Sequence, residues 1–161
     1  MGQAIKKNKV EYIDRVHGNS KGWITRSCID ENGYSQWHYK YLELKETDLT
    51  GENIYITLNT FYKPCRRLEC IKELNFVYID LDYYKTKYTK EQIIMNLESN
   101  YFNKIIPATN YIIDSGRGLA LLWNINKVPS QALPLWKAIQ EYLYHQLKEF
   151  GADRQALDGR K

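Results

Sequence analysis

The amino-acid sequence predicts an α+β fold: a mostly antiparallel sheet with helices on one side, plus a small β-rich portion at the N-terminus. Two observations predict this class. Short runs of alternating apolar and polar residues, which are typical of strands, are joined by tight-turn sequences such as Asn32-Gly33. Two later stretches repeat apolar residues at helical spacing. A chain of 161 residues with 43% hydrophobic residues is long enough for one such domain.

The composition argues against several classes of protein. Three cysteines without a Cys-x-x-Cys pair do not indicate a disulfide framework and fit a reducing cytoplasm, and Cys65 and Cys70 lack a fourth ligand at zinc-site spacing. The sequence has no apolar run long enough to cross a bilayer and no signal-peptide pattern, so we expect a cytoplasmic protein with no membrane partner. Its 14 tyrosines and net charge of +4 suit a surface that binds nucleic acid.

The first 52 residues are expected to form an N-terminal β-hairpin region of the same unit. Asn32 and Gly33 both tolerate positive φ, so they predict a tight turn between two strands. The expected elements are, in chain order, a flexible basic lead-in, a strand, a returning strand and a connection: residues 1–20, 21–29, 34–41 and 42–51.

The returning strand has two interpretations. Alternation places Trp37, Tyr39 and Tyr41 on one face and His38 and Lys40 on the other. Aromatic and basic side chains of this kind are typical of a surface that binds nucleic acid. The same pattern is typical of an ordinary amphipathic hairpin, and the sequence does not separate the two.

Residues 53–161 are expected to form the core that carries the chemistry. Before residue 76 the sequence predicts a strand, a basic loop and a short helix: residues 53–61, 62–67 and 69–74. The loop is interpreted either as a phosphate contact or as a solvated segment. The stretch 76–84 then combines strand-forming apolar and aromatic residues with two acids.

These acids, Asp80 and Asp82, are the first candidate site residues. Side chains alternate along a strand, so the two carboxylates point to one side while Ile79 and Leu81 point into a core. Neighbouring ionised carboxylates repel each other unless a cation lies between them, and oxygen ligands favour Mg²⁺ or Mn²⁺. The alternative is a strand end that runs into a polar turn, with both acids solvated.

After residue 84 the sequence predicts a helix, two strands and a final helix. Thr89 opens the first helix with Gln92 in place for a capping box, and Gly151 suits the position after the last helix. The expected boundaries of these elements are residues 89–101, 110–114, 119–125 and 130–150.

A tight turn between the two strands is the second candidate. Its glycines allow the backbone to approach a ligand closely, and exposed N–H groups together with Ser115 and Arg117 suit a phosphate. A glycine-rich hairpin also occurs for geometric reasons alone. The residues of the turn are Ser115, Gly116, Arg117 and Gly118.

Asp153 and Asp158 are the third candidate, because each could bring a further carboxylate to a metal site. Two metal ions shared by carboxylates can activate a 3′-hydroxyl and stabilise the leaving pyrophosphate.

The three candidates lie in the order of three motifs of the archaeo-eukaryotic primase superfamily, which this sequence resembles. The matching stretches are Tyr-Ile-Asp-Leu-Asp at 78–82, Ile-Ile-Asp-Ser-Gly-Arg-Gly-Leu-Ala-Leu-Leu-Trp at 112–123 and Gly-Ala-Asp-Arg-Gln-Ala-Leu-Asp at 151–158. The resemblance covers about residues 53–161 and is greatest to primase-polymerase domains of replication proteins from bacterial plasmids and mobile elements. The order of elements also resembles that of palm-like or RRM-like nucleotide-handling domains.

The resemblance implies roles for the candidates. The implied ligands of Mg²⁺ or Mn²⁺ are Asp80, Asp82, Asp158 and, as second choice for the third carboxylate, Asp153. The residues implied to hold the incoming triphosphate are Ser115, Gly116, Arg117 and Gly118. An upstream strand that would line the same cleft contributes Asn59, Thr60 and Phe61. The implied partners are a single-stranded DNA template, nucleoside triphosphates and a helicase domain or partner in a replication complex.

Two departures from the family's pattern bear on activity. Ala120 stands where the second motif of the family carries a phosphate-contacting His, and a methyl group cannot make that contact. The sequence also stops at Lys161, where the strand of the third motif should continue toward an Arg and a Pro-Gly-Thr stretch. We therefore expect a fragment or a shortened relative whose core is truncated at its C-terminus.

Three functions follow as hypotheses. The first is a DNA primase-polymerase, which is a metal-dependent nucleotidyltransferase. The second is a catalytically degenerate module of the same fold that binds nucleic acid or nucleotide in replication or regulation. The third, a rolling-circle endonuclease, needs two His ligands separated by one residue, whereas His17, His38 and His145 are scattered.

Overall fold

The structure is a computed structural model that describes residues 2–51 and 53–160. Packing divides the chain into two compact units, which are described separately. The first unit contains the residues up to 75, residues 127–130 and the last residues from 159; the second contains residues 76–126 and 131–158. The sequence predicts a hairpin region over residues 1–52 and a core that carries the chemistry over residues 53–161. This assignment stays a prediction.

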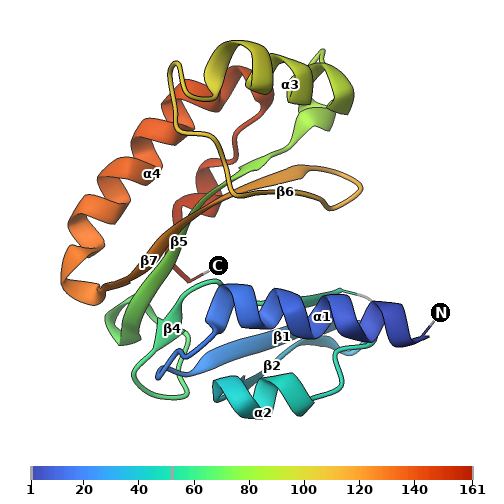
Figure 1. Cartoon of the computed structure of the whole chain (residues 1–161), viewed down its shortest axis with the longest axis vertical. Helices are drawn as coiled ribbons and strands as arrows, with labels where there is room; N and C mark the ends of the chain where they lie inside the picture. The colour runs from blue at the N-terminus through green and yellow to red at the C-terminus, as the bar shows by residue number, and fades with distance from the viewer. Residues whose placement is uncertain (1, 52, 161) are drawn as a thin grey trace. The chain divides into compact units, whose positions relative to one another are not determined.

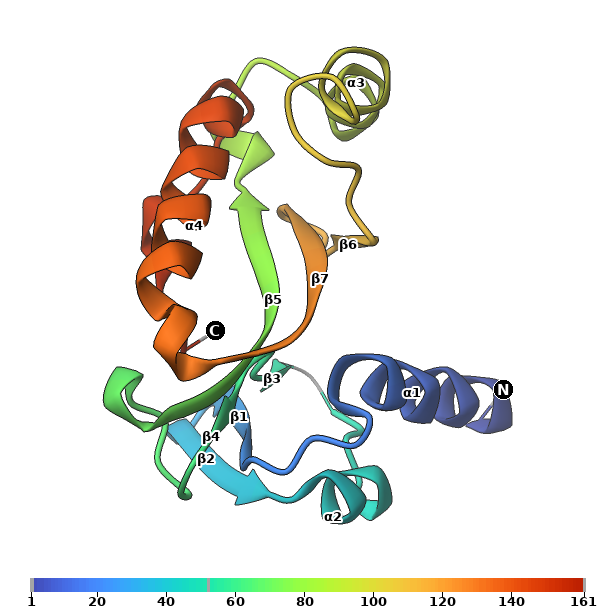
Figure 2. The same ribbon diagram turned by 60° about the vertical axis from the view of Figure 1, so that its left-hand side comes forward.

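The first unit is built on a three-stranded antiparallel sheet with the strand order β2-β1-β3 (Figures 1 and 2). The predicted hairpin is confirmed: β1 (Ile24–Asp30) pairs with β2 (Gly33–Tyr39) along its whole length. Gly33, at φ 109°, supplies the turn conformation that side chains rarely adopt. The third strand, β3 (Ile54–Ile56), pairs with the other edge of β1.

Two helices of the first unit replace segments expected to be irregular. The lead-in forms α1 (Gly2–His17), and the connection after the hairpin contains α2 (Tyr41–Glu46). Ile13, Ile24 and Leu44, one from each of α1, β1 and α2, are fully buried together. This tertiary packing stabilises two helices whose polar composition indicated loops.

The predicted strand over 53–61 is wrong in its extent. Thr57, Leu58 and Asn59 interrupt it, and its two ends become β3 and the short strand β4 (Thr60–Phe61), which belong to different sheets. The helix predicted before residue 76 is only the 3₁₀ turn η1 (Leu68–Cys70). Strand β5 (Ile71–Leu81) begins directly after it and pairs through its first residues with β4.

The interrupted segment packs on a buried polar cluster. Asn59 accepts a hydrogen bond from the Asn75 N–H at 2.9 Å and donates one to the Gly159 carbonyl at 2.9 Å. His17 is fully buried, with its Nδ1 atom 3.5 Å from Asn75 Nδ2. Burial disfavours the charged ring and lowers the pKa of His17 to about 3.

The second unit contains the remainder of β5 and the strands β7 (Leu119–Pro129, which continues into the first unit) and β6 (Tyr111–Asp114). The sheet order is β4-β5-β7-β6, and β6 pairs antiparallel with β7 from Tyr111↔Leu122 to Asp114↔Leu119. With the helices below, these strands confirm the predicted α+β class with mostly antiparallel sheets. The palm-like or RRM-like arrangement stays a prediction.

The helices of the second unit follow the sequence closely. The capping box of Thr89 and Gln92 opens α3 (Lys90–Asn96), which continues as a π-helical turn, η3 (Leu97–Tyr101). The 3₁₀ turns η4 (Ser130–Ala132) and η5 (Lys148–Phe150) flank α4 (Leu133–Leu147), and Gly151 follows at φ 81° as predicted. The remaining 3₁₀ turns are η2 (Tyr83–Lys85) and η6 (Arg154–Leu157).

In the part of the chain that the structure describes, no helix has the length and apolar character to cross a membrane.

Helix α4 lies alongside β5 and closes its outer edge within the second unit (Figures 1 and 2). The Tyr78 N–H donates to Gln140 Oε1 at 3.0 Å, and Trp136 Nε1–H donates to the Phe76 carbonyl at 2.8 Å. The Trp136 ring also packs edge-on against Tyr78, with ring centroids 5.8 Å apart. Side chains of α4 therefore provide the hydrogen bonds that a neighbouring strand would otherwise provide.

The buried histidine predicts a loss of stability in acid. Unfolded His17 takes up a proton near pH 6.5, whereas the buried ring stays neutral until about pH 3, so the unfolded state binds more protons between these values. In this window His17 lowers the free energy of unfolding by about 1.4 kcal/mol for each pH unit of acidification. Urea denaturation across the window should give His17→Gln a shallower pH dependence than the natural chain. An equal pH dependence of the two proteins would contradict the lowered pKa of His17.

The edge contact of α4 gives a second prediction. Gln140→Leu leaves the Tyr78 N–H buried without its acceptor, and we expect the free energy of unfolding to fall by about 1 kcal/mol or more. Amide hydrogen exchange at Tyr78 should accelerate in the same variant. Lys137→Ala, an exposed change on the same helix, is the matched control and should stay within about 0.5 kcal/mol. An unchanged exchange rate at Tyr78 in Gln140→Leu would contradict the assigned contact.

Candidate active site

Asp80 and Asp82 lie at the C-terminal end of β5, where the strand gains a new neighbour in place of α4. The Asp82 N–H donates to the Gly151 carbonyl and the Asp153 N–H donates to the Asp80 carbonyl, each at 2.8 Å, around a bridge between Leu81 and Ala152. The backbone of both acids is thus fixed from the outer side. Both side chains are partly exposed, that of Asp82 to 25%.

The two acids are expected to share one face of the sheet. Phe76 and Tyr78 precede them on the same face, and the Phe76 ring packs against Tyr111 of β6 at a centroid distance of 6.2 Å. Because Tyr111 is two residues from Ile113 and Ile113 pairs with Ala120, Ala120 also belongs to this face. The position where the resembled family has a His therefore lies on the same face as the acid pair.

The predicted turn after β6 lies next to Asp82. A Cβ atom at Gly118 would be 2.9 Å from the Leu81 carbonyl oxygen and 3.6 Å from Asp82 Oδ1. On the other side, a Cβ atom at Gly151 would be 2.7 Å from the Asp82 carbonyl oxygen. Glycine at these two positions allows both neighbouring segments to approach the end of β5.

Hydrogen bonds inside the turn use most of its polar groups. Ser115 N–H donates to the Gly118 carbonyl at 3.0 Å, and Gly118 N–H donates to Ser115 Oγ at 3.1 Å. The Ser115 hydroxyl donates to the Gly118 carbonyl, and Gly116 N–H donates to Asp114 Oδ1. Arg117 is exposed and makes no ion pair with the described residues. Its guanidinium is therefore the group of the turn that is best placed to meet a phosphate.

Two lysines balance the acids around the turn. Lys85 Nζ lies 2.6 Å from Asp82 Oδ2, and this hydrogen bond raises the pKa of Lys85. Lys90 Nζ lies 2.7 Å from Asp114 Oδ2, and its hydrogen bond, followed by that of the Gly116 N–H, lowers the pKa of Asp114. Asp114 thus joins the first turn of α3 to the turn after β6.

The two late acids are placed differently. Asp153 lies opposite Asp80 in the antiparallel bridge, so the two positions share a face, while the Asp153 carboxylate accepts the Gln155 N–H at 3.0 Å. The Asp158 carbonyl accepts a hydrogen bond from the Tyr78 hydroxyl. Register brings Asp153 closer to the acid pair than sequence reasoning indicated, and the choice between Asp153 and Asp158 as third carboxylate stays a prediction.

The donor set of the acid pair fits a hard divalent cation, because Asp80, near the end of β5, and Asp82, directly after it, both offer carboxylate oxygens. Among the described residues no group of three or more His, Cys, Asp or Glu side chains is gathered as a metal site. A pair of carboxylates is nevertheless a common protein contribution to Mg²⁺, whose other positions are taken by water and phosphate oxygens. The upstream candidates Asn59, Thr60 and Phe61 are buried in the first unit.

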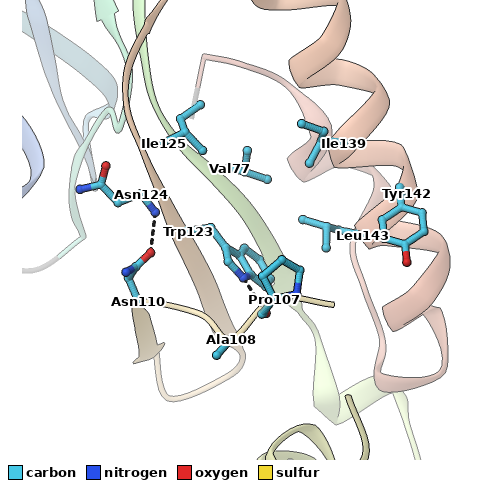
Figure 3. A pocket seen from close by; sticks show the side chains of 10 residues that line it. All are labelled: Val77, Pro107, Ala108, Asn110, Trp123, Asn124, Ile125, Ile139, Tyr142 and Leu143. Atoms are coloured by element: carbon cyan, nitrogen blue, oxygen red, sulfur yellow. Dashed lines mark hydrogen bonds between the residues drawn. The ribbon is translucent and has the colours of Figure 1, made fainter. Parts of the chain in front are cut away.

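A cavity of about 560 Å³ lies on the opposite face of the second unit's sheet, between α4 and the strands (Figure 3). Val77, Ile139 and Leu143 line it with apolar groups. Trp123 and Pro107 also line it, and the Trp123 Nε1–H donates to the Pro107 carbonyl at 3.0 Å. Val77 alternates with Tyr78 and Asp80, so this cavity is separated from the acid pair by the sheet. The residues that line this cavity include no Asp, Glu, His, Lys or Arg.

Sequence reasoning missed several residues around the site. Lys85 follows Asp82 at a spacing of three, which is a usable local signal for an ion pair. Tyr83, whose hydroxyl donates to the Gly116 carbonyl at 3.3 Å, and Lys90, which pairs with a residue 24 positions away, had no local signal.

Comparison with known proteins gives one informative match. A curated protein of Clostridium perfringens named "Replication protein" is 72% identical to this chain over 158 residues, which is 98% of this chain and 39% of the relative. The chain therefore spans about two fifths of the length of the curated relative it matches. No protein-family model matches the chain, and no solved structure matches it.

The ion pair that braces the turn can be tested by titration. Lys90→Met removes the hydrogen bond that contributes most to the lowered pKa of Asp114, so we expect this pKa to rise toward 3.8. The rise should be partial, because the Gly116 N–H still donates to the carboxylate. Carboxyl-detected NMR titration measures the change, with Lys87→Met, which alters an exposed lysine nearby, as control. A similar rise of the Asp114 pKa in both variants would attribute it to the loss of a positive charge in general, and would contradict the role of the Lys90 hydrogen bond.

Proposed function

We propose that this chain is the primase-polymerase portion of a replication protein, transferring nucleotides to a 3′-hydroxyl on a single-stranded DNA template. The observation that carries the proposal is the acid pair at the end of β5 with a tight turn against Asp82. The name of the 72% identical relative supports a role in replication. The resemblance of the three sequence stretches to primase motifs supports the chemistry.

In this proposal Asp80 and Asp82 hold Mg²⁺ or Mn²⁺, with Asp153 or Asp158 as the further carboxylate. A bound divalent ion would activate the 3′-hydroxyl and stabilise the leaving pyrophosphate. Lys85 donates to Asp82 at 2.6 Å, so it would hold the carboxylate in place until a cation replaces it. The fixed backbone of both acids limits the rearrangement that binding requires.

The turn contributes the phosphate contact. Arg117, exposed at the turn, offers a planar guanidinium that can bind two phosphate oxygens at once. Ser115 holds the shape of the turn through its hydrogen bonds with Gly118. A nucleoside triphosphate bound by Arg117 would lie near Asp82, because the neighbouring residue Gly118 is directly beside that carboxylate.

The second candidate is a module that binds nucleotide or nucleic acid without turnover. Two observations favour it: Ala120 offers no hydrogen bond on the face of the acid pair, and the N–H groups of Ser115, Gly116 and Gly118 are already used inside the turn. Both candidates predict binding, and only the first predicts incorporation.

The test is extension of a primed DNA template with a labelled nucleoside triphosphate, with Mn²⁺ binding followed by calorimetry. Asp80→Asn with Asp82→Asn removes both negative charges at constant shape, and we expect incorporation and Mn²⁺ binding to fall to background. Folding stability should change little, because the relief of repulsion between two neighbouring carboxylates offsets the loss of the exposed Lys85–Asp82 ion pair. Glu98→Gln, an exposed acid of the same unit, should retain both activities.

Three outcomes separate the candidates. Incorporation that depends on the acid pair supports the primase-polymerase. Nucleotide binding without incorporation by the natural chain supports the second candidate. Incorporation or Mn²⁺ binding that survives the double substitution contradicts the assignment of Asp80 and Asp82.

A further inference from the structure

One face of the three-stranded sheet in the first unit presents exposed aromatic side chains. Antiparallel register places Ser27 between Gln36 on β2 and Tyr55 on β3, and it places Ile29 opposite Tyr34. Residues that are directly paired share a face, so these five side chains point the same way. We call the exposed members, Ile29, Tyr34, Gln36 and Tyr55, the tyrosine face.

The tyrosine face is solvent-exposed while the opposite face supports the core. Tyr34, Tyr55 and Ile29 are 55%, 53% and 50% exposed, although all three are large side chains within paired strands. Ile24 and Ile56, on the opposite face, pack with residues of α1 and α2. The aromatic rings of the tyrosine face are therefore not needed to fill this core.

An arginine from the basic loop is fixed at the edge of the tyrosine face. Arg66 Nη1 donates to the Tyr34 hydroxyl at 2.8 Å, and this hydroxyl in turn donates to Gln36 Oε1 at 3.1 Å. Arg66 Nε donates to the Arg160 carbonyl at 2.8 Å. The hairpin and the basic loop, which the sequence offered as two separate candidates for contact with nucleic acid, thus meet at one surface.

The charge of the chain is concentrated in the same unit. The first unit contains 15 Lys and Arg against 10 Asp and Glu, whereas the second contains 8 against 9. Lys63 and Arg67 are exposed on the loop that carries Arg66. Asp30 and Glu31 are the acids of the hairpin turn, and Asp30 belongs to the opposite face, where its carboxylate accepts the Asn32 N–H.

We propose that the tyrosine face and the basic loop from Lys63 to Arg67 form a binding surface for single-stranded DNA. Exposed tyrosine rings stack on unpaired bases, and the loop cations meet the phosphates that follow. A duplex keeps its base faces inside the stack, so these rings favour single strands. Sequence preference is expected to be weak, because every base offers a face for stacking.

The proposal deepens the function proposed above, since it names where that protein would hold its template, but it can fail independently. The residues involved lie in the first unit, whereas Asp80 and Asp82 belong to the second. Binding of DNA is measured without metal or nucleotide. Asp80→Asn with Asp82→Asn should therefore leave DNA binding unchanged even where incorporation is lost.

The test uses the whole chain and a fluorescent oligothymidylate of about 15 nucleotides, followed by anisotropy. We expect Tyr34→Leu and Tyr55→Leu each to weaken binding by about 10-fold. Tyr34→Phe and Tyr55→Phe keep the ring and should stay within about 3-fold of the natural chain. Circular dichroism and thermal unfolding establish that each variant is folded, and the salt dependence of the loop variant described next still tests the surface if a Leu variant is not.

Charge and face are tested with two further changes. Lys63→Gln with Arg67→Gln should lower the slope of log affinity against log salt by about 0.7 for each charge removed. Trp37→Leu is the matched control: Trp37 lies on β2 with 44% exposure but on the opposite face, where Arg26 stacks on its ring at 5.0 Å. Binding by Trp37→Leu should be unchanged.

Several results would overturn the proposal. They are unchanged binding by both Leu variants, an equal loss in Trp37→Leu, tighter binding of a duplex or of an RNA strand of the same length, or a salt slope that does not respond to the loop substitutions. Loss of binding in the Leu variants with retention in the Phe and Trp37 variants would support stacking on the tyrosine face.

Discussion

The second unit depends on how the outer edge of β5 is satisfied. From Phe76 to Asp82, alternate residues direct their backbone polar groups away from the rest of the sheet, and each such group that is buried needs a partner. Trp136 and Gln140 of α4 serve the first half of this edge, and Gly151 and Asp153 serve the second half. One helix and the segment that follows it thereby complete the strand.

This constraint also determines where the acids lie. The residues whose backbone faces the outer edge are the same residues whose side chains face away from the apolar cavity, because both properties alternate with a period of two. Closing the edge therefore fixes the backbone of Asp80 and Asp82 and is expected to leave their carboxylates on the other face. Glycine at 118 and 151 then allows the neighbouring segments to approach without a side chain between them and Asp82.

The features that the sequence predicted correctly are those that local chemistry determines. The Asn32-Gly33 hairpin, the capping box of Thr89 and the left-handed Gly151 each depend on a few adjacent residues. The common face expected for Asp80 and Asp82 stays a prediction, because β5 ends at Leu81 and Asp82 directly follows it. Helices α1 and α2 escaped prediction because shared burial stabilises them, and the pairing of Lys90 with Asp114 left no local trace because it joins segments 24 residues apart.

The distribution of charge gives the two proposed surfaces complementary roles. In the proposal, the first unit, where cations exceed acids, would attract a polyanion, and its exposed rings would offer the bases a place to stack. The second unit has a slight excess of acids, so Asp80 and Asp82 would repel a phosphate unless the proposed cation offset their charge. In the proposed enzyme, affinity for the template would therefore come from the basic unit and be independent of metal. Entry of a triphosphate beside Asp82 would depend on the metal, so template binding and nucleotide binding are expected to respond differently to its removal.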